Sequence, residues 1–207
     1  MLTVFGVGDI ILTSKAQFVA LKTVIDRLVS PPDIEWQNFQ RLFHSRSLKE
    51  GEYFIRAGQP SEYLGFINAG LVRFFYQTPR GTEFNKSFSQ ENQFMGAYSA
   101  FLTDKVARLS IQAMEETHIL VAKISVIVNL YDKHRCWEKL GRLLAEQLYI
   151  KKEQREAEFL LDDAETRYHN FLEQYPGLEN RLAQYHIASY LGITPVALSR
   201  IRKKGKS

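Results

Sequence analysis

The sequence is poor in the residues that build metal centres and disulfides. Its 207 residues include one cysteine, Cys136. A single cysteine forms no intrachain disulfide and cannot hold an iron–sulfur cluster, which needs about four ligands. The five histidines show no spacing typical of a metal site. We therefore expect no bound metal. A single cysteine with no disulfide partner is consistent with a reducing cytoplasm.

Long apolar runs are also lacking. No uninterrupted apolar stretch approaches the ~20 residues of a membrane-spanning helix. The apolar start, residues 1–12, contains Asp9 and lacks the basic region that opens a signal peptide. The sequence therefore predicts a cytoplasmic protein with no membrane partner.

Signatures of catalysis are missing as well. The glycines form neither a GxGxxG nor a GxxxxGKS/T phosphate-binding pattern. No Ser/His/Asp, Cys/His or paired-carboxylate arrangement is recognisable. The adjacent acids Glu115-Glu116 and Asp162-Asp163 are explained more simply as part of a turn and as a helix cap, respectively. We predict that the protein is not an enzyme.

Acidic residues are absent from the end of the chain. Residues 181–207 contain no acid and six basic residues, whereas residues 1–180 contain slightly more acidic than basic side chains. The six are Arg181, Arg200, Arg202, Lys203, Lys204 and Lys206. A local positive charge of this kind is typical of a segment that contacts nucleic-acid phosphates. A solvated basic tail is the alternative.

Hydrophobic periodicity divides the chain into four parts, with an α+β fold class. Residues 1–34 are an N-terminal extension with a helix over 15–29, and a second short helix covers 35–43. Residues 35–132 contain short strands and turn glycines, which predict an all-β roll. A long helix over 133–161 follows, and residues 162–207 are helical, with a first helix over 164–175. The expected strands are 53–56, 63–67, 71–76, 83–88, 109–113 and 118–124.

The helix over 133–161 has a narrow apolar stripe, formed by Trp137, Leu140, Leu144 and Leu148. A long helix with such a stripe between two compact segments commonly pairs with its own copy. We therefore predict dimerisation through these four residues. Packing of the helix on its own β-domain alone is the alternative.

Residues 184–203 have the pattern of a helix-turn-helix. Ile187, Ala188 and Leu191 supply the inner face of the first helix, and Gly192 permits the sharp turn. Thr194 is a natural N-cap for the second helix. An ordinary helical hairpin with a basic end is the alternative. His186 is expected at the surface, and Tyr190 is expected to be a packing aromatic.

The outer face of the second helix, over 195–203, predicts contacts with double-stranded DNA. Arg200 can donate two hydrogen bonds to a guanine edge, Ser199 can bond a base or phosphate, and Val196 or Ala197 can meet a thymine methyl group. The polar residues around them suit phosphates, namely Thr194, Arg202, Lys203, Lys204 and Lys206.

The order of β-roll, long helix and helix-turn-helix resembles the Crp/Fnr family of bacterial transcription regulators. The segments 48–55, 58–60, 63–67 and 70–72 are similar to its cyclic-nucleotide-binding β-roll, glycine for glycine. Residues 140–147 are similar to its dimerisation helix, and residues 187–200 to its DNA-binding helices. The resemblance covers about residues 21–204 and implies a homodimeric, DNA-binding regulator that also contacts RNA polymerase.

Two departures from the family pattern stand out. The candidate ligand pocket contains Gly96, Ala97, Tyr98, Ser99 and Arg108, and Ala97 replaces the glutamate that accepts hydrogen bonds from a ribose hydroxyl. Arg108 either faces an anion or lies at the surface. We favour a roll filled by aromatic side chains and no cofactor, with another small effector or cyclic AMP as alternatives.

The second departure is the short stretch after the recognition helix, where many family members have a β-hairpin wing. Without a wing, we expect weaker and more salt-dependent DNA binding. The favoured function is therefore a homodimeric regulator that reads an inverted repeat. A ligand- or partner-binding module without specific DNA recognition is the alternative.

Overall fold

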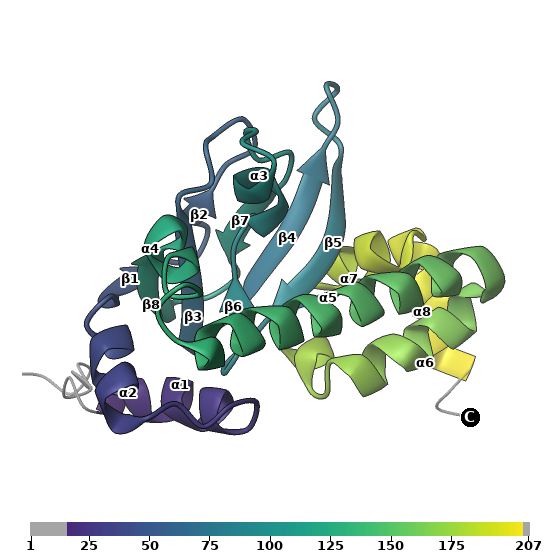
Figure 1. Ribbon diagram of the computed structural model, residues 1–207. Coiled ribbons are helices and arrows are strands. Elements are labelled where there is room, and N and C mark those ends of the chain that lie inside the picture. The colour runs from purple at the N-terminus through teal and green to yellow at the C-terminus, as the bar shows by residue number, and fades with distance from the viewer. Residues whose placement is uncertain (1–15, 205–207) are drawn as a thin grey trace, which may run out of the picture.

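The computed structural model of the chain describes residues 16–204, so the predictions for residues 1–15, for Lys206 and for the stretch after the recognition helix lie outside it. Within this part, two antiparallel sheets form a β-roll, and a long helix runs across the roll to a helical C-terminal domain (Figure 1). The α+β fold class predicted from the sequence is confirmed.

Each of the two sheets has four strands. The first has the order β1-β8-β3-β6, from His44–Leu48, Thr117–Lys123, Tyr63–Ala69 and Phe94–Met95. The second has the order β2-β7-β4-β5, from Tyr53–Ile55, Ser110–Ala113, Val72–Gln77 and Glu83–Ser89. All six predicted strands are present, whereas β1 and β6 were not predicted. Four of the five side chains of β1 are exposed, so no apolar alternation marks this strand.

The predicted helices are also present. They are α1 (Ala16–Asp26), α2 (Asp33–Gln40), α5 (Arg135–Leu161), α6 (Ala164–Gln174), α7 (Gln184–Leu191) and α8 (Pro195–Lys204). The sequence did not predict the short helices α3 (Tyr98–Leu102) and α4 (Ile124–Val128), or the 3-10 turn Leu178–Asn180, because one turn of helix carries too few residues for a periodic signal. No helix in residues 16–204 is both long and apolar enough to cross a membrane.

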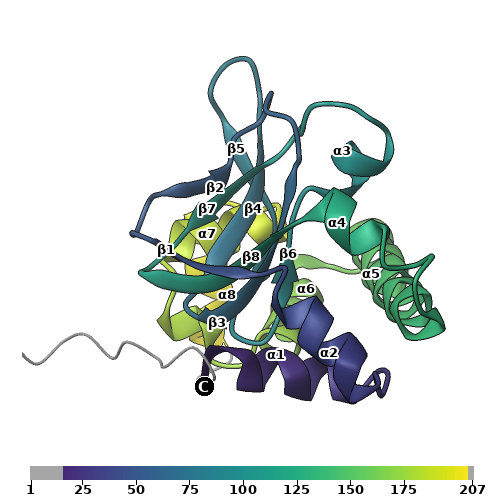
Figure 2. The ribbon, with the colours of Figure 1, turned by 60° about the vertical axis from the view of Figure 1, so that its left-hand side comes forward.

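Two of the three hydrophobic cores join segments far apart in the sequence. One core fills the inside of the roll. The second joins α1 and α2 to the start of α5, where the rings of Phe39 and Trp137 stack 4.4 Å apart. The third joins Leu71 and Phe88 of the second sheet region to the aromatic residues of the C-terminal domain. The roll and the helical domain therefore share a core. Figure 1 shows α5 running from one to the other, and Figure 2 shows it at the side of the roll.

The position of α5 corrects part of the dimerisation prediction. Trp137 and Leu140 are buried within their own chain, with 2% and 5% of their surface exposed. Leu144 is half-buried against the same core, and only Leu148 is exposed. An apolar stripe shows that a helix face is buried, but not which surface buries it. Trp137 and Leu140 anchor α5 to the roll and offer no surface to a second copy.

Replacement of Gly70 by alanine should strongly destabilise the roll. Gly70 has φ +108°, and a Cβ atom there would lie 2.6 Å from the Thr117 Cα. Backbone strain and this clash together should cost about 3 kcal/mol or more, measured by urea unfolding. Gly81→Ala is the control, because Gly81 also has a positive φ but open space around it, and it should cost about 1 kcal/mol. Equal losses in the two variants would contradict the close approach at Gly70.

Candidate nucleic-acid interface

The geometry of α7 and α8 matches the predicted helix-turn-helix. Gly192 ends α7 in the left-handed region at φ +70°. Ile187, Ala188 and Leu191 of α7 and Leu198 of α8 are buried against one another. The inner face of the first helix assigned from the sequence is therefore confirmed, because the spacing of its apolar residues and the turn glycine together fix how the two helices cross.

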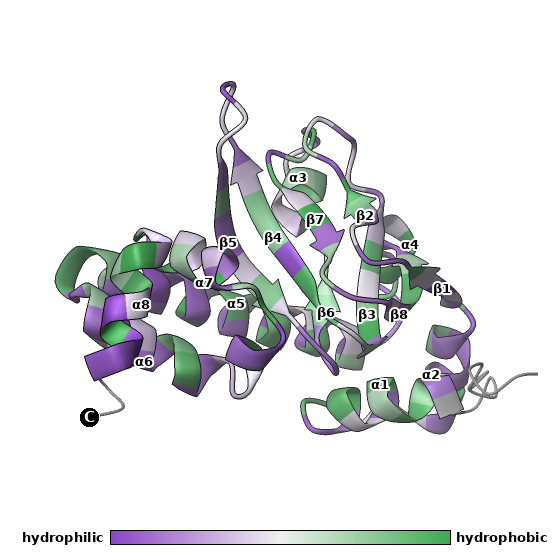
Figure 3. Ribbon diagram, turned by 180° about the vertical axis from the view of Figure 1, so that it is seen from behind, coloured by the Kyte–Doolittle hydropathy of each residue, from purple (hydrophilic) through white to green (hydrophobic). Residues whose placement is uncertain are grey.

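The second helix begins at a defined residue. The Thr194 hydroxyl oxygen accepts a hydrogen bond from the Ala197 backbone N–H at 3.2 Å, as expected for an N-cap. The outer residues Thr194, Val196, Arg200, Lys203 and Lys204 are exposed, and Ala197, Ser199 and Arg202 are half-buried. Figure 3 shows the hydrophilic end of α8 next to the C-terminus.

Arg200 is exposed and makes no hydrogen bond or ion pair with any residue in 16–204. Lys204, in contrast, lies 3.4 Å from the Glu165 carboxylate of α6. Arg181, at the start of the basic end, also pairs with acids, since its guanidinium lies 2.9 Å from Glu91 and 2.5 Å from Glu115 of the roll. Arg200 is therefore a positive charge on α8 without an acidic partner in residues 16–204, unlike Arg181 and Lys204.

Side chains from α5 and α6 hold the turn of this motif. Arg155 of α5 donates to the Tyr190 carbonyl, and Arg167 of α6 donates to the Leu191 carbonyl at 3.2 Å. These carbonyls belong to the last turn of α7 and have no partner within the helix. Phe159 of α5 packs so close to Gly192 that an added Cβ would lie 2.9 Å from its ring. The long helix therefore supports the turn directly.

The other side of α7 lies on the edge strand β5. The Ser189 hydroxyl accepts a hydrogen bond from the Asn85 backbone N–H at 3.0 Å and donates to the Glu83 carbonyl at 3.3 Å. An edge strand leaves such backbone groups without a partner in the sheet. One serine of the helix-turn-helix therefore satisfies two groups of the β5 edge, and this contact ties α7 to the roll.

His186 lies in a polar network at the same contact, so its predicted surface position is wrong. It is 4% exposed, and the Asn85 amide donates to its carbonyl at 3.0 Å and lies 3.1 Å from its Nδ1. Arg73, which pairs with Glu83 at 2.7 Å, lies on the other side of Asn85. Burial, and then the charge of Arg73, lower the pKa of His186 to about 4. The imidazole is therefore neutral at neutral pH.

Tyr190 is the packing aromatic that the sequence predicted. It is 2% exposed, and its ring packs against those of Phe88, Phe171 and Tyr175. His186, Asn85 and Ser189, in contrast, were not assigned a role from the sequence. The only sequence feature that indicated a polar contact on α7 was the spacing of His186 and Ser189, which lie three residues apart on one side of this buried helix.

The predicted ligand pocket does not come together around Arg108. Arg108 is exposed and Ala97 is buried, whereas Gly96 and Tyr98 are half-buried and Ser99 is exposed. The interior of the roll is occupied by buried apolar side chains, among them Phe74 and Met95. Tyr98 stacks with Phe101. Burial, and then a hydrogen bond with Tyr98, raise the pKa of Tyr131. The interior is therefore filled, but mainly by aliphatic side chains, so the aromatic filling expected from the sequence is wrong.

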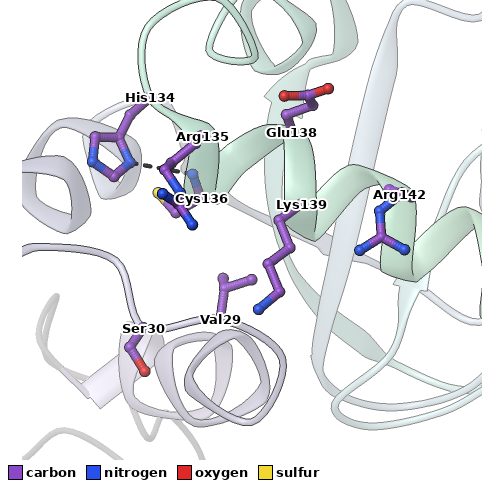
Figure 4. A pocket seen from close by; sticks show the side chains of 8 residues that line it. All are labelled: Val29, Ser30, His134, Arg135, Cys136, Glu138, Lys139 and Arg142. Atoms are coloured by element: carbon purple, nitrogen blue, oxygen red, sulfur yellow. Dashed lines mark hydrogen bonds between the residues drawn. The ribbon is translucent and has the colours of Figure 1, made fainter.

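A cavity of about 410 Å³ lies at the start of α5, at the opposite end of this helix from α7 and α8 (Figures 1 and 4). Figure 4 shows Lys139 extending from α5 toward Val29 of the α1–α2 loop. The His134 ring accepts a hydrogen bond from the Cys136 N–H at 3.2 Å and thereby caps α5. This cavity is separate from the helix-turn-helix and from the inside of the roll.

The buried His186 makes stability depend on pH. Because its folded-state pKa of about 4 lies below its ordinary value of 6.5, the unfolded chain binds the proton more readily. Its contribution to stability is complete above about pH 6.5 and is lost as the pH falls toward about 4. The His186→Asn variant keeps a hydrogen-bond acceptor near the position of Nδ1. Its free energy of unfolding, measured with urea, should fall less between pH 6.5 and 4 than that of wild type. His169→Asn is the control, because His169 is exposed and the variant should lose as much free energy of unfolding as wild type. An equal loss in His186→Asn would contradict the buried neutral imidazole.

Comparison with known proteins identifies the parts of this architecture. Residues 45–134 match the cyclic nucleotide-binding domain family. No curated protein sequence matches the chain. Among solved structures, the chain is similar to FixK2 from Bradyrhizobium japonicum, with 21% identity, a TM-score of 0.66, and coverage of 78% of this chain and 83% of that chain.

Two further structures have the same TM-score of 0.66. A CooA mutant from Carboxydothermus hydrogenoformans is 20% identical, with coverage of 87% of this chain and 86% of that chain. A transcriptional regulator of the Crp/Fnr family from Eubacterium rectale is 11% identical, with coverage of 85% and 84%. Residues 45–134 are therefore similar to cyclic nucleotide-binding domains, and the chain has the fold of these solved regulators.

Proposed function

We propose that the protein is a DNA-binding transcription regulator that acts as a homodimer on an inverted-repeat site. The observation that carries the proposal is the exposed basic face of α8, where Arg200 has no partner in residues 16–204. A helix of this kind, presented by a helix-turn-helix, fits the major groove of DNA. Recognition helices of a dimer would then read half-sites about 34 Å apart.

Each residue of α8 has a distinct role in this proposal. Arg200 donates two hydrogen bonds to a guanine edge, while Ser199, Ala197 and Val196 contact neighbouring base edges. Arg202, Lys203 and Lys204 bind phosphates, and Lys204 exchanges its pairing with Glu165 for a phosphate oxygen. Thr194 keeps its capping role, because its hydroxyl oxygen is occupied by the Ala197 N–H. Its hydroxyl hydrogen can still be donated to a phosphate.

The dimer would use the exposed part of α5 beyond its anchored start, and it would begin at Leu143, which itself packs against the core that holds Trp137 and Leu140. Leu143, Ile150 and Ala157 recur every seven residues, and Leu161 follows four residues later. Ile150 and Leu161 are 51% and 83% exposed. Apolar residues at this spacing form the seam of a coiled coil. This seam, defined as Leu143, Ile150, Ala157 and Leu161, replaces Trp137 and Leu140 as the proposed contact, and Leu148 borders the other side.

Cyclic AMP is not the proposed effector, because Ala97 cannot accept a hydrogen bond from a ribose hydroxyl through its side chain and Arg108 lies at the surface. Contact with RNA polymerase stays a prediction that follows from the resemblance to bacterial regulators.

Arg200→Ala should weaken specific DNA binding by about 10-fold or more, since a bidentate arginine–guanine contact is worth about 1–3 kcal/mol. The binding site is first selected from genomic fragments, and affinity is then measured by fluorescence anisotropy at fixed salt. Arg80→Ala is the matched control, because it removes the same charge at the β4–β5 turn, far from α8 (Figure 1). Equal, sequence-independent affinity of wild type and Arg200→Ala would contradict the proposal.

A charge in the seam should abolish dimerisation. Light scattering after size exclusion should give twice the chain mass for wild type and the chain mass for Ile150→Glu, because a carboxylate cannot be buried in an apolar seam without a partner. Tyr149→Glu is the control, since Tyr149 is 68% exposed on another side of α5. Monomeric wild type, or a dimer that survives Ile150→Glu, would contradict the proposed contact.

A further inference from the structure

Lys86 occupies an unusual place in strand β5. In the pairing of β4 with β5, Phe74 lies opposite Ser87 and Phe75 lies opposite Asn85, so Lys86 is an extra residue without a partner. Such a β-bulge changes the direction of the side chain that it carries, and bulges often lie next to functional sites. The Lys86 side chain is half-buried, which is uncommon for a lysine.

Two further lysines lie close to Lys86. Together with burial, the positive charges of Lys152 and Lys151 of α5 lower the pKa of the Lys86 ammonium. The Lys151 ammonium lies 4.8 Å from the centre of the Tyr175 ring. Tyr175 in turn packs on Phe88, two residues along the strand from Lys86, with the ring centres 5.9 Å apart. The Tyr175 hydroxyl also accepts a hydrogen bond from the Phe88 N–H at 3.5 Å. Tyr175 therefore links β5, two residues from Lys86, to α5 at the position of the Lys151 ammonium group.

No acid compensates this cluster of Lys86, Lys151 and Lys152. Within residues 16–204 none of the three forms an ion pair or a hydrogen bond with a carboxylate. Burial, and then the charges of Lys152 and Lys151, lower the pKa of the Lys86 ammonium. Three like charges that come from two elements and repel one another are destabilising without a counter-ion.

We propose that the three lysines form a binding site for the phosphate groups of a small anionic ligand, between β5 and α5. Lysine ammonium groups bind phosphate as point charges, and several of them suit a di- or triphosphate better than a single carboxylate. The site is distinct from the residues around Gly96 and Arg108. Its Tyr175 and Phe88 neighbours belong to the core shared by the roll and the helix-turn-helix domain.

A small ligand fits this position better than duplex DNA. Lys86 is half-buried beside α5, whereas the proposed DNA-reading residues Val196 and Arg200 are exposed on α8. A half-buried ammonium can reach a small anion that enters beside it, but not the backbone of a rigid duplex. The proposal does not depend on DNA binding and can be tested without it.

Thermal unfolding with inorganic tripolyphosphate tests the site. For wild type, tripolyphosphate about 100-fold above its Kd should raise Tm by about 5 to 10 °C more than sodium chloride of equal ionic strength. Lys86→Met keeps the apolar stem and removes the charge. Without the anion this variant should unfold at a higher Tm than wild type, because repulsion is relieved, and its response to tripolyphosphate should be lost. A higher Tm without the anion, together with a smaller rise of Tm on adding it, distinguishes a ligand site from a purely structural role of Lys86.

The double variant Lys151→Met/Lys152→Met should give the same loss of response and provides a second measurement should Lys86→Met fail to fold. Lys133→Met is the control, since Lys133 is exposed in the loop before α5 and should respond like wild type. A wild-type response no larger than that of the salt, a full wild-type response in both the Lys86 and the double variant, or a lysine-dependent response to a duplex but not to tripolyphosphate would overturn the proposal.

Discussion

The architecture depends on how the free edge of strand β5 is covered. An edge strand presents N–H and C=O groups that lack a partner in their own sheet. Here Ser189 of α7 bonds to the Asn85 N–H and the Glu83 carbonyl, so the first helix of the helix-turn-helix takes the place of a neighbouring strand. Phe88 of the same strand enters the aromatic core of the C-terminal domain. This contact makes two domains into one folded unit.

The remaining features follow from this seating of α7. With its inner side packed against the sheet and α8, α7 leaves the outer face of α8, where Arg200 lies, exposed. The long helix α5 must then run past the roll and support the turn at Gly192 through Phe159. The first turns of α5 are buried by its own chain, whereas Ile150 farther along the helix is exposed. The lysines of β5 and α5 are brought together by the same arrangement.

The sequence predicted the features that have local causes. The end of α7 and the start of α8 were predicted, because Gly192 permits the turn and Thr194 caps the second helix by backbone chemistry. Features with distant causes were missed. The strand β1 is polar and exposed, His186 is buried only because β5 lies against it, and Trp137 is buried by α1 and α2. Periodicity identifies a buried face, but its partner is set by the tertiary fold.

Amide hydrogen exchange at Asn85, followed residue by residue by NMR, tests the central contact most directly. If α7 covers the edge of β5, the Asn85 amide should exchange as slowly as amides inside the β4–β5 ladder, because its N–H donates to Ser189. Ser189→Ala should accelerate this one amide and leave the ladder amides protected. Rapid exchange of Asn85 in wild type, unchanged by Ser189→Ala, would contradict the account.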